Sequence, residues 1–369
     1  MAATHHSPPV ASAEHAQSQH RRARGGQGAS GAQRRPRGPR GLRGITQRPW
    51  WPWLTRGLAA AFFAVVATLI VRQARTVDWP AVWQALLALP ASVLAVAGAL
   101  AVASHCTYGT FDLIGRHCTG HPLSRARTLR IAMTSYPFTL NLGSLIGGVG
   151  VRYRLYDRQG VNPGTIVQVV GTSILTNWVG YLLLAGVLAW VWQPPPVAGW
   201  GVQPWQWRLG GTLLGCLPVV YIALCAVRGG RALTLRGHAF PLPRWRVALW
   251  QVGVSATNWM LMGAALWTVL QGQASYPAAL ATVLLGAVAG LVLRVPAGLG
   301  VLESVGVALL TTQALGQEKV LAALLAYRAL YYFGPLVLAA MAFGVAELRW
   351  RQQTGADGVP QQSSAKKTA

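Results

Sequence analysis

The side chains best suited to chemistry in this sequence are ionisable groups that lie inside or beside long apolar segments. Four of them stand out by position: Asp112, Arg294, Glu303 and Arg328. A charged side chain at the centre of a bilayer costs about 2.5–3.5 kcal/mol even on a lenient insertion scale. Each of the four therefore needs an opposite charge or a bound ligand. Glu303 or Asp112 could neutralise Arg328 in a structural ion pair, and the alternative is a site for an anionic headgroup or a coupling ion.

Arg328 also has aromatic neighbours. It lies within the run LLAYRALYYFGPLVL, where Tyr331, Tyr332 and Pro335 follow at helical spacing on roughly the same side. We therefore group Tyr331 with Arg328 in the candidate site.

Glycine and proline interrupt two apolar stretches, which read GSLIGGVGVRYR and LRVPAGLGVLES. A broken helix releases backbone N–H and C=O groups that hydrocarbon cannot satisfy, so such backbone survives only against protein, water or a ligand. The alternative is that the glycines only permit close helix packing. The helix-break residues are Gly147, Gly148, Gly150, Pro296, Gly298 and Gly300.

Arg152 and Arg154 follow the first break immediately. The end of a half-helix with free N–H groups carries partial positive charge, which suits a phosphate. The two arginines are therefore candidates for binding a lipid headgroup. The alternative is that they lie near the membrane interface, set the topology and extend their charged ends into the headgroup layer.

Other kinds of site find little support. The chain has eight acidic residues, no pairing of a nucleophile with a base, no Walker A lysine and no HExxH motif. We therefore expect no enzymatic activity, no cofactor and no metal. The metal-capable residues lack paired short spacing and surround a predicted helix end: His105, Cys106, His117, Cys118 and His121.

Long apolar helices must position these residues. Hydrophobic residues make up 53% of the chain and charged residues 11%, which is more apolar surface than a soluble core could bury. About 20 apolar residues cross a hydrocarbon core of about 30 Å. We predict an all-α, polytopic membrane protein with about six full spans plus two re-entrant or broken helical hairpins. The spans are expected at 54–71, 91–114, 164–192, 209–227, 247–270 and 320–348, and the hairpins at 131–150 and 277–315.

The placement of basic residues favours hairpins over full crossings. If both broken stretches return to the side that they enter from, the cytosolic connections hold twelve basic residues and the outer connections four. Full crossings would reverse this positive-inside bias, although length alone leaves both topologies open. Three crossings per half would make residues 51–192 and 209–348 an inverted repeat, with hairpins at corresponding places, as in secondary transporters.

Both ends of the chain are expected to be disordered and cytosolic, flanking a membrane domain at 51–348. Residues 1–50 form a basic arm, and ten arginines within residues 1–56 face one acid, Glu14. An arm joined to a first span favours an anionic leaflet, at about 1 kcal/mol per basic side chain, so we expect no nucleic-acid partner. Residues 349–369 form the tail.

Several runs resemble a known family. YGTFDLIGRHCTGHPL, NLGSLIGGVGVRYRLYDRQGV, VPAGLGVLESV and LLAYRALYYFGPLVLA are together similar to the YbhN-type bacterial inner-membrane proteins, within the superfamily named after the transmembrane region of lysylphosphatidylglycerol synthase. The similarity runs from about residue 50 to 348. It implies a multi-pass inner-membrane protein with a role in lipid translocation. The soluble aminoacyl-transferase domain of the full synthases is expected to be absent, because the chain ends shortly after its last span. The implied site residues are Arg152, Arg154, Pro296, Gly298, Gly300, Glu303, Arg328 and Tyr331.

Two function classes compete. The first is a flippase-type translocator that admits an anionic phospholipid headgroup between the hairpins while the acyl chains stay in lipid. The second is a non-catalytic accessory or scaffold subunit in phospholipid synthesis, such as a cardiolipin or phosphatidylglycerol pathway. The expected partners are membrane phospholipids and, in the second class, a phospholipid synthase. The sequence leaves the headgroup, coupling ion, direction and oligomeric state open.

Overall fold

A computed structural model describes residues 78–143, 148–195, 201, 203–231, 233–235, 238–240 and 242–356. The basic arm at 1–50, the span expected at 54–71, and Gly147 lie outside the described residues. So does the end of the predicted tail, from residue 357 onward.

The first part of the described chain contains two long helices separated by a hairpin. A short helix, α3 (Trp79–Leu87), begins at Asp78, whose carboxylate accepts a hydrogen bond from the backbone N–H of Ala81. The long helix α4 (Ala91–Thr119) ends at Gly120, whose left-handed backbone (φ 66°) suits glycine. Helices α5 (Arg125–Leu142) and α6 (Val151–Asp157) then form the hairpin, and α7 (Pro163–Val191) follows.

The second part repeats this order. Helix α8 (Pro204–Arg228) and a two-stranded antiparallel ribbon, β1 (Leu233–Leu235) with β2 (His238–Phe240), come first. A long helix, α9 (Trp245–Val269), leads into a hairpin of α10 (Tyr276–Leu293), the short turn η2 (Pro296–Gly298) and α11 (Val301–Leu310). The last helix consists of α12 (Gln317–Arg328), a π-helical segment η3 (Ala329–Phe333) and α13 (Gly334–Ala356).

Both broken stretches reverse the direction of the chain. In the second hairpin, a Cβ on Gly286 would lie 2.6 Å from the Leu302 side chain, and a Cβ on Gly290 would lie 3.4 Å from the Gly298 Cα, so the two arms run side by side. The return arm α11 has 10 residues. At 1.5 Å per residue it is about 15 Å long, roughly half of a 30 Å hydrocarbon core. The returning arm therefore cannot be a full crossing.

The helical membrane class is confirmed. Within the described residues, five helices are long and apolar enough to cross a membrane: α4, α7, α8, α10 and the continuous helix Gln317–Val345. Helix α10 is among them by length, although it forms the outbound arm of a hairpin. Helix α9 is not, although it has 25 residues, as α8 does.

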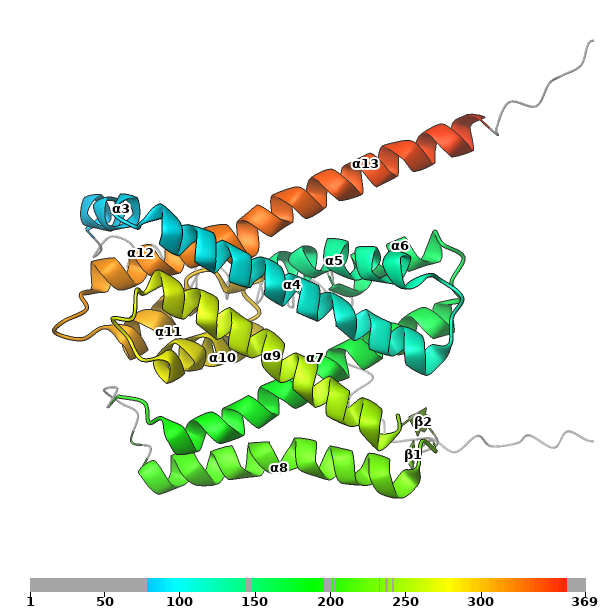
Figure 1. Cartoon of the computed structure of the whole chain (residues 1–369), viewed down its shortest axis with the longest axis horizontal. Coiled ribbons are helices and arrows are strands. Elements are labelled where there is room, and N and C mark those ends of the chain that lie inside the picture. Colours follow the sequence, from blue (N-terminus) through cyan, green and yellow to red (C-terminus); the bar gives the residue numbers. More distant parts are fainter. Residues whose placement is uncertain are drawn as a thin grey trace, which may run out of the picture. The chain divides into compact units, whose positions relative to one another are not determined.

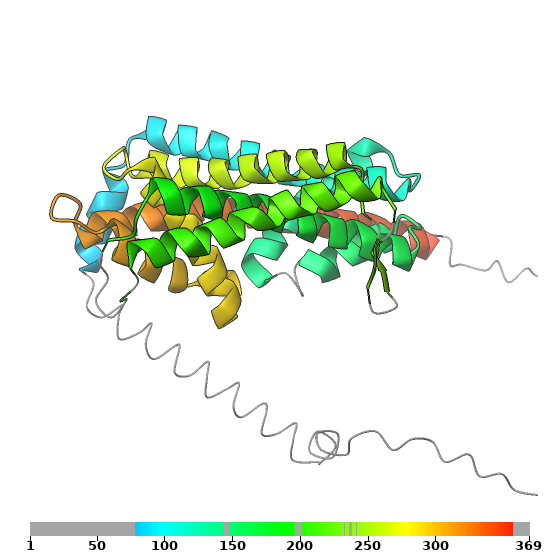
Figure 2. The ribbon, with the colours of Figure 1, turned by 90° about the horizontal axis from the view of Figure 1, so that it is seen from below.

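Helix α9 packs against α4, and the two run in opposite directions (Figure 1). Helix α7 packs against both α8 and α9, and α7 and α8 lie side by side in both views (Figure 2). Residues of α9, α10 and α12 make up much of the largest buried apolar cluster. The two hairpins are therefore mounted on a frame of long helices.

Helix α13 extends into the segment that was expected to form the C-terminal tail. Helix α13 continues to Ala356, past the expected end of the membrane domain at residue 348. Its last turns contain ELRWRQQ, which is polar but made of good helix formers, so the helix outlasts the apolar run that defined the span.

Close packing of α7 on α9 predicts a strong effect of a single methyl group. A Cβ on Gly180 would lie 2.3 Å from the Ser255 Oγ and 2.4 Å from the Ala256 backbone nitrogen. Gly180→Ala should therefore destabilise the protein by about 1–3 kcal/mol, the usual cost of overpacking. Thermal unfolding in detergent, followed by tryptophan fluorescence, would measure this.

Gly171 is the matched control, because it lies on the same helix and a Cβ there would meet nothing within 4 Å. Gly171→Ala should leave the unfolding midpoint unchanged or raise it slightly. Equal midpoints for the two variants would contradict the close α7–α9 contact.

Candidate functional site

Arg328 binds the turn of the second hairpin. Its guanidinium donates to the carbonyl oxygens of Ala297 (2.8 Å) and Gly298 (2.6 Å). It also forms an ion pair with Glu303, in which Nη2 lies 3.0 Å from Oε2 and Nε contacts Oε1. The Arg328 side chain is 1% exposed and that of Glu303 17%. The partner expected for Arg328 is therefore present, and the carbonyl groups released by the helix break are bonded by the same arginine.

A π-helical segment directly follows Arg328. Pro335 lacks a backbone N–H, and its ring would clash with the carbonyl of Tyr331 in a regular α-helix. The wider π turn over Ala329–Phe333 accommodates this. It also places the Tyr332 ring 5.3 Å from the Arg328 guanidinium carbon, within cation–π distance.

A second buried ion pair joins the first hairpin to α4. The Arg152 Nε lies 3.5 Å from Asp112 Oδ2, and the two side chains are 2% and 0% exposed. Asp112 also accepts a hydrogen bond from the Tyr156 hydroxyl (2.9 Å). Arg152 donates further to hydroxyl oxygens of three helices: those of Ser135 on α5, Ser173 on α7 and Tyr108 on α4.

Arg152 and Arg154 have different environments. Arg152 is buried, whereas the side chain of Arg154 is 56% exposed and pairs with Glu347 on α13 at 3.1 Å. Arg158 also contacts Glu347. Residues two apart on a helix point in nearly opposite directions, so one side chain enters the core and the other faces out.

A cluster of hydroxyl groups lies between the two ion pairs. The Tyr331 hydroxyl is 2.7 Å from Ser104 Oγ and 3.1 Å from the Tyr136 hydroxyl, and Ser104 donates to Asn258 Oδ1 at 2.8 Å. The His105 ring lies 4.9 Å from the Tyr136 ring and 4.8 Å from the Tyr331 ring. Ser104 and Asn258 occupy the middle of α4 and α9, so the cluster marks the middle of the frame.

Sequence reasoning named Tyr331 in this cluster but missed its partners. The signal that could have found them is the spacing on α4, where His105, Tyr108 and Asp112 recur every three or four residues within an apolar helix. A polar stripe on a membrane helix faces protein rather than lipid. Tyr108 and Tyr136 stack with ring centres 3.5 Å apart, which joins the hydroxyl cluster to the Arg152 pair.

The two hairpins contact each other near the middle of the helical frame. Helix α5 contacts the η2 turn, and the Asn141 side chain donates to the Tyr332 carbonyl oxygen at 3.1 Å. That carbonyl belongs to the π-helical segment beside the second hairpin. The end of α5, the outbound arm of the first hairpin, therefore lies against the η2 turn of the second hairpin.

The predicted break residues do not all act alike. In the second hairpin, Gly298 (φ 57°), Gly300 (φ 76°) and Ala297 (φ 55°) have left-handed backbone, and Pro296 begins the η2 turn. In the first, Gly150 has ordinary helical geometry, so it is no break by itself. A Cβ on Gly148 would lie 3.0 Å from the Thr139 side chain, which favours the close-packing alternative for that residue.

Arg294 is the exception among the arginines of the two hairpin cores. It ends α10 with left-handed backbone (φ 54°), is exposed, and forms no ion pair with the described residues. It precedes Ala297 by three residues, which places it near the turn that Arg328 binds. An exposed guanidinium at this position can bind an anion that comes from outside the protein.

The described residues arrange no other obvious chemistry. No group of three or more His, Cys, Asp or Glu side chains gathers among them. His105 Nδ1 is 2.8 Å from the Ala101 carbonyl oxygen, while Cys106 and Cys118 are exposed. Asp112 Oδ1 is buried and has no hydrogen-bond partner within the part of the chain that is described.

Known proteins are similar to this chain over the region that contains the two hairpins. A family model described as "Lysylphosphatidylglycerol synthase TM region" matches residues 57–339, which include both hairpins, both buried ion pairs and Arg294. The chain is 38% identical to "Inner membrane protein YbhN" of Escherichia coli (strain K12) over 301 residues, which are 81% of this chain and 94% of that relative. It is 29% identical to the protein slr0712 of Synechocystis sp. over 318 residues, 81% of this chain and 95% of the relative.

We predict that the Asp112–Arg152 pair contributes to the stability of the folded protein. Asp112→Asn or Arg152→Gln alone leaves one buried charge without a partner, which should cost about 3–5 kcal/mol. The double variant removes both charges and should lose clearly less than the sum of the single losses. Equilibrium unfolding of purified protein in mixed micelles, analysed as a double-mutant cycle, measures the coupling.

Arg154→Gln is the control, because it lies two residues from Arg152 but pairs at the surface, where an ion pair contributes about 0–1 kcal/mol. Additive losses in the cycle, or a loss for Arg154→Gln as large as for Arg152→Gln, would contradict a buried pair.

Proposed function

The chain belongs to the lysylphosphatidylglycerol synthase TM-region family, and on that basis we propose that it translocates an anionic phospholipid headgroup between leaflets. The acyl chains stay in the bilayer while the headgroup passes the two hairpins. We place the protein in a bacterial inner membrane with both ends of the chain cytosolic. The E. coli relative is named as an inner membrane protein, which supports this location. The basic residues of the predicted cytosolic connections support the orientation.

The single observation that carries this proposal is Arg294. Arg152 and Arg328 are each neutralised by a carboxylate, whereas Arg294 is exposed at the hairpin turn without an ion-pair partner among the described residues. A charge at membrane depth requires an anion or water. A phospholipid phosphate is the anion that a membrane offers in quantity.

Two hairpins that approach from opposite ends support a transport mechanism. In secondary transporters, broken helices place a binding site near the midplane, and movement of one repeat against the other exposes it alternately. Here the end of α5 contacts the η2 turn, and Asn141 on α5 donates to the Tyr332 carbonyl in η3, so a displacement of either hairpin would change access to Arg294. The Asp112–Arg152 pair joins the first hairpin to α4, and the Glu303–Arg328 pair joins the second hairpin to α12. Each hairpin would therefore move together with the helix to which it is paired.

We infer that the activity is transport rather than catalysis. The hydroxyl oxygens of Ser135 and Ser173 accept hydrogen bonds from Arg152, and the Ser135 hydroxyl donates to backbone carbonyls of its own helix. Ser173 also hydrogen-bonds Asp112, a carboxylate that already pairs with Arg152. Asp112 is buried and Glu303 is partly buried, and each is paired with an arginine. Paired acids are poorly suited to proton transfer, which needs a group of matched pKa within reach of a substrate.

Arg294→Gln tests the proposed function. Purified protein would be reconstituted into liposomes with fluorescent phosphatidylglycerol, and lipid that reaches the inner leaflet would be measured by protection from dithionite. We expect the variant to translocate at least about tenfold more slowly, because the guanidinium that binds the headgroup is gone, while its unfolding midpoint stays unchanged. Arg328→Ala is a poorer test, since it also removes the hydrogen bonds to the turn.

Arg246→Gln is the matched control, because it removes an exposed arginine at the start of α9, where it lies over the Trp245 ring. It should translocate lipid at the wild-type rate. An unchanged rate for Arg294→Gln would overturn the assignment of the headgroup site. Absence of translocation by the wild type, together with a copurifying phospholipid synthase, would favour the scaffold function instead.

A further inference from the structure

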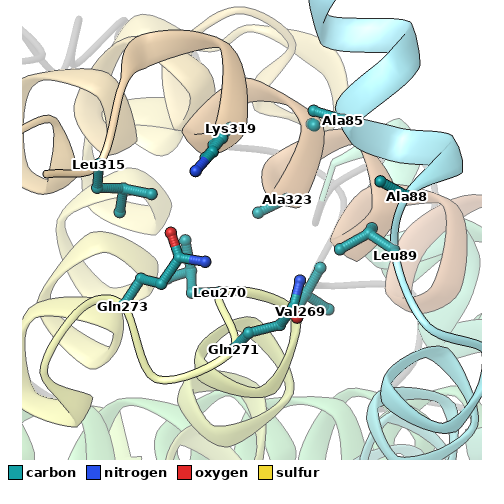
Figure 3. Close-up of a pocket in the computed structure, with 11 residues that line it drawn as sticks. Ala85, Ala88, Leu89, Val269, Leu270, Gln271, Gln273, Leu315, Lys319 and Ala323 are labelled. Carbon is teal, nitrogen blue, oxygen red and sulfur yellow. The ribbon is translucent and has the colours of Figure 1, made fainter.

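A cavity of about 230 Å³ lies at the end of the molecule where α4 begins and α9 turns into α10. Helix α3, the α9–α10 turn, the loop before α12 and α12 itself enclose it (Figure 3). It is separate from the hairpin turn: none of its lining residues takes part in either buried ion pair or in the hydroxyl cluster.

The polar side chains of the cavity are one amine and two amides, all of which can donate hydrogen bonds to an anion. Lys319 is the one charged residue that lines it, and its amine and the Gln273 amide point into the same opening (Figure 3). Gln271 adds a second amide from a residue with left-handed backbone (φ 51°). Lys319 forms no ion pair with the described residues.

The nearest acid does not neutralise Lys319. Glu318 precedes it in the first turn of α12, but its Oε2 lies 3.1 Å from where a Cβ on Gly316 would be, so its carboxylate folds back over the helix start. Gly316 provides no side-chain cap for α12. Lys319 therefore has no ion-pair partner among the described residues, and an anion in the cavity would offset its charge.

The position of the cavity fits the boundary between lipid and water. Helix α3 buries Val82 against Leu321 and Ala322 of α12, while Trp79 and Trp83 are exposed. Exposed tryptophans on a short amphipathic helix are typical of a membrane interface. Lipid chains can therefore lie along α3 while a headgroup reaches the cavity beside it.

The size of the cavity limits the occupant. Pockets for drug-sized ligands usually measure about 300–1,000 Å³. At about 230 Å³, this cavity has room for a phosphate headgroup but not for a lipid with its acyl chains. Apolar side chains form much of the remaining wall, including Leu89, Leu315 and Ala323.

We propose that this cavity binds the anionic headgroup of a phospholipid of the leaflet at that end, through Lys319 and the amides of Gln271 and Gln273. The site follows from the cavity and from membrane insertion alone, so it does not depend on translocation. If the protein is a translocator, the cavity would be a second position for a headgroup, at the interface rather than at the hairpin turn.

Native mass spectrometry of the full-length protein in detergent tests this, with titration of dioleoyl phosphatidylglycerol and, in parallel, of zwitterionic dioleoyl phosphatidylcholine. We expect the wild type to bind phosphatidylglycerol in preference to phosphatidylcholine, with one bound lipid that depends on Lys319. Lys319→Gln should raise the dissociation constant of that lipid at least about tenfold, which corresponds to about 1.4 kcal/mol. Unchanged binding by Lys319→Gln overturns the proposal.

Two further variants locate the lipid. Ala88→Phe fills the cavity from an exposed position without changing charge and should weaken binding as Lys319→Gln does. Arg208→Gln removes an arginine near the same end, where it lies over the Trp190 ring, and should bind normally. Weakening by Arg208→Gln, or normal binding by Ala88→Phe, would show a surface-charge effect and overturn the cavity site.

The remaining outcomes separate this site from other sources of phosphate and from the transport site. Soluble glycerol 3-phosphate that binds as tightly as the lipid would overturn the lipid assignment. Arg294→Gln should retain Lys319-dependent binding even where it abolishes translocation, so failure of one proposal is distinguishable from failure of the other. Loss of this binding in Arg294→Gln would place the lipid at the hairpin turn and overturn the cavity site.

Discussion

Hydrocarbon offers no hydrogen-bond partner, and this constraint explains why so much of the structure is arranged around Arg328. The second hairpin turns near the middle of the helical frame, so its turn releases carbonyl oxygens that only protein can bond there. Arg328 bonds those of Ala297 and Gly298, and Glu303 neutralises its charge. One turn of helix later, Tyr331 closes the hydroxyl cluster with Ser104. The last helix thus holds the hairpin and joins it to α4 at one depth.

The two hairpins are attached to the frame through different groups. In the second, the arginine comes from a neighbouring helix and binds backbone; in the first, Arg152 comes from the hairpin itself and binds side chains of the frame. Each arrangement pairs one arginine with one carboxylate, so each hairpin is neutral where it meets the frame. A neutral, hydrogen-bonded attachment can be displaced as a unit without carrying net charge through lipid.

Much of this could be predicted from sequence, and the limits have physical causes. Glycine and proline interruptions located both hairpins. The cost of an isolated charge indicated Glu303 or Asp112 as a partner for Arg328, and in the structure Glu303 is the partner. The sequence could not show which of Arg152 and Arg154 is buried, because a seven-residue helix is too short for its periodicity to reveal the buried side. Tyr136 was missed because tyrosine is common in membrane helices, and only its stacking on another helix distinguishes it.

The backbone of Arg294 strengthens the case that its side chain is used. A helix that ends in left-handed conformation usually has glycine at that position, and another residue there costs about 1–2 kcal/mol. Arg294 adds to this strain a charge that no described carboxylate neutralises: Asp112 and Glu303 are paired elsewhere, and Glu347 binds Arg154 and Arg158. Glycine would end the helix with less strain and no charge. Strained backbone and an unmatched charge at one residue favour a role in binding, and an anion from the membrane would offset the cost of that charge.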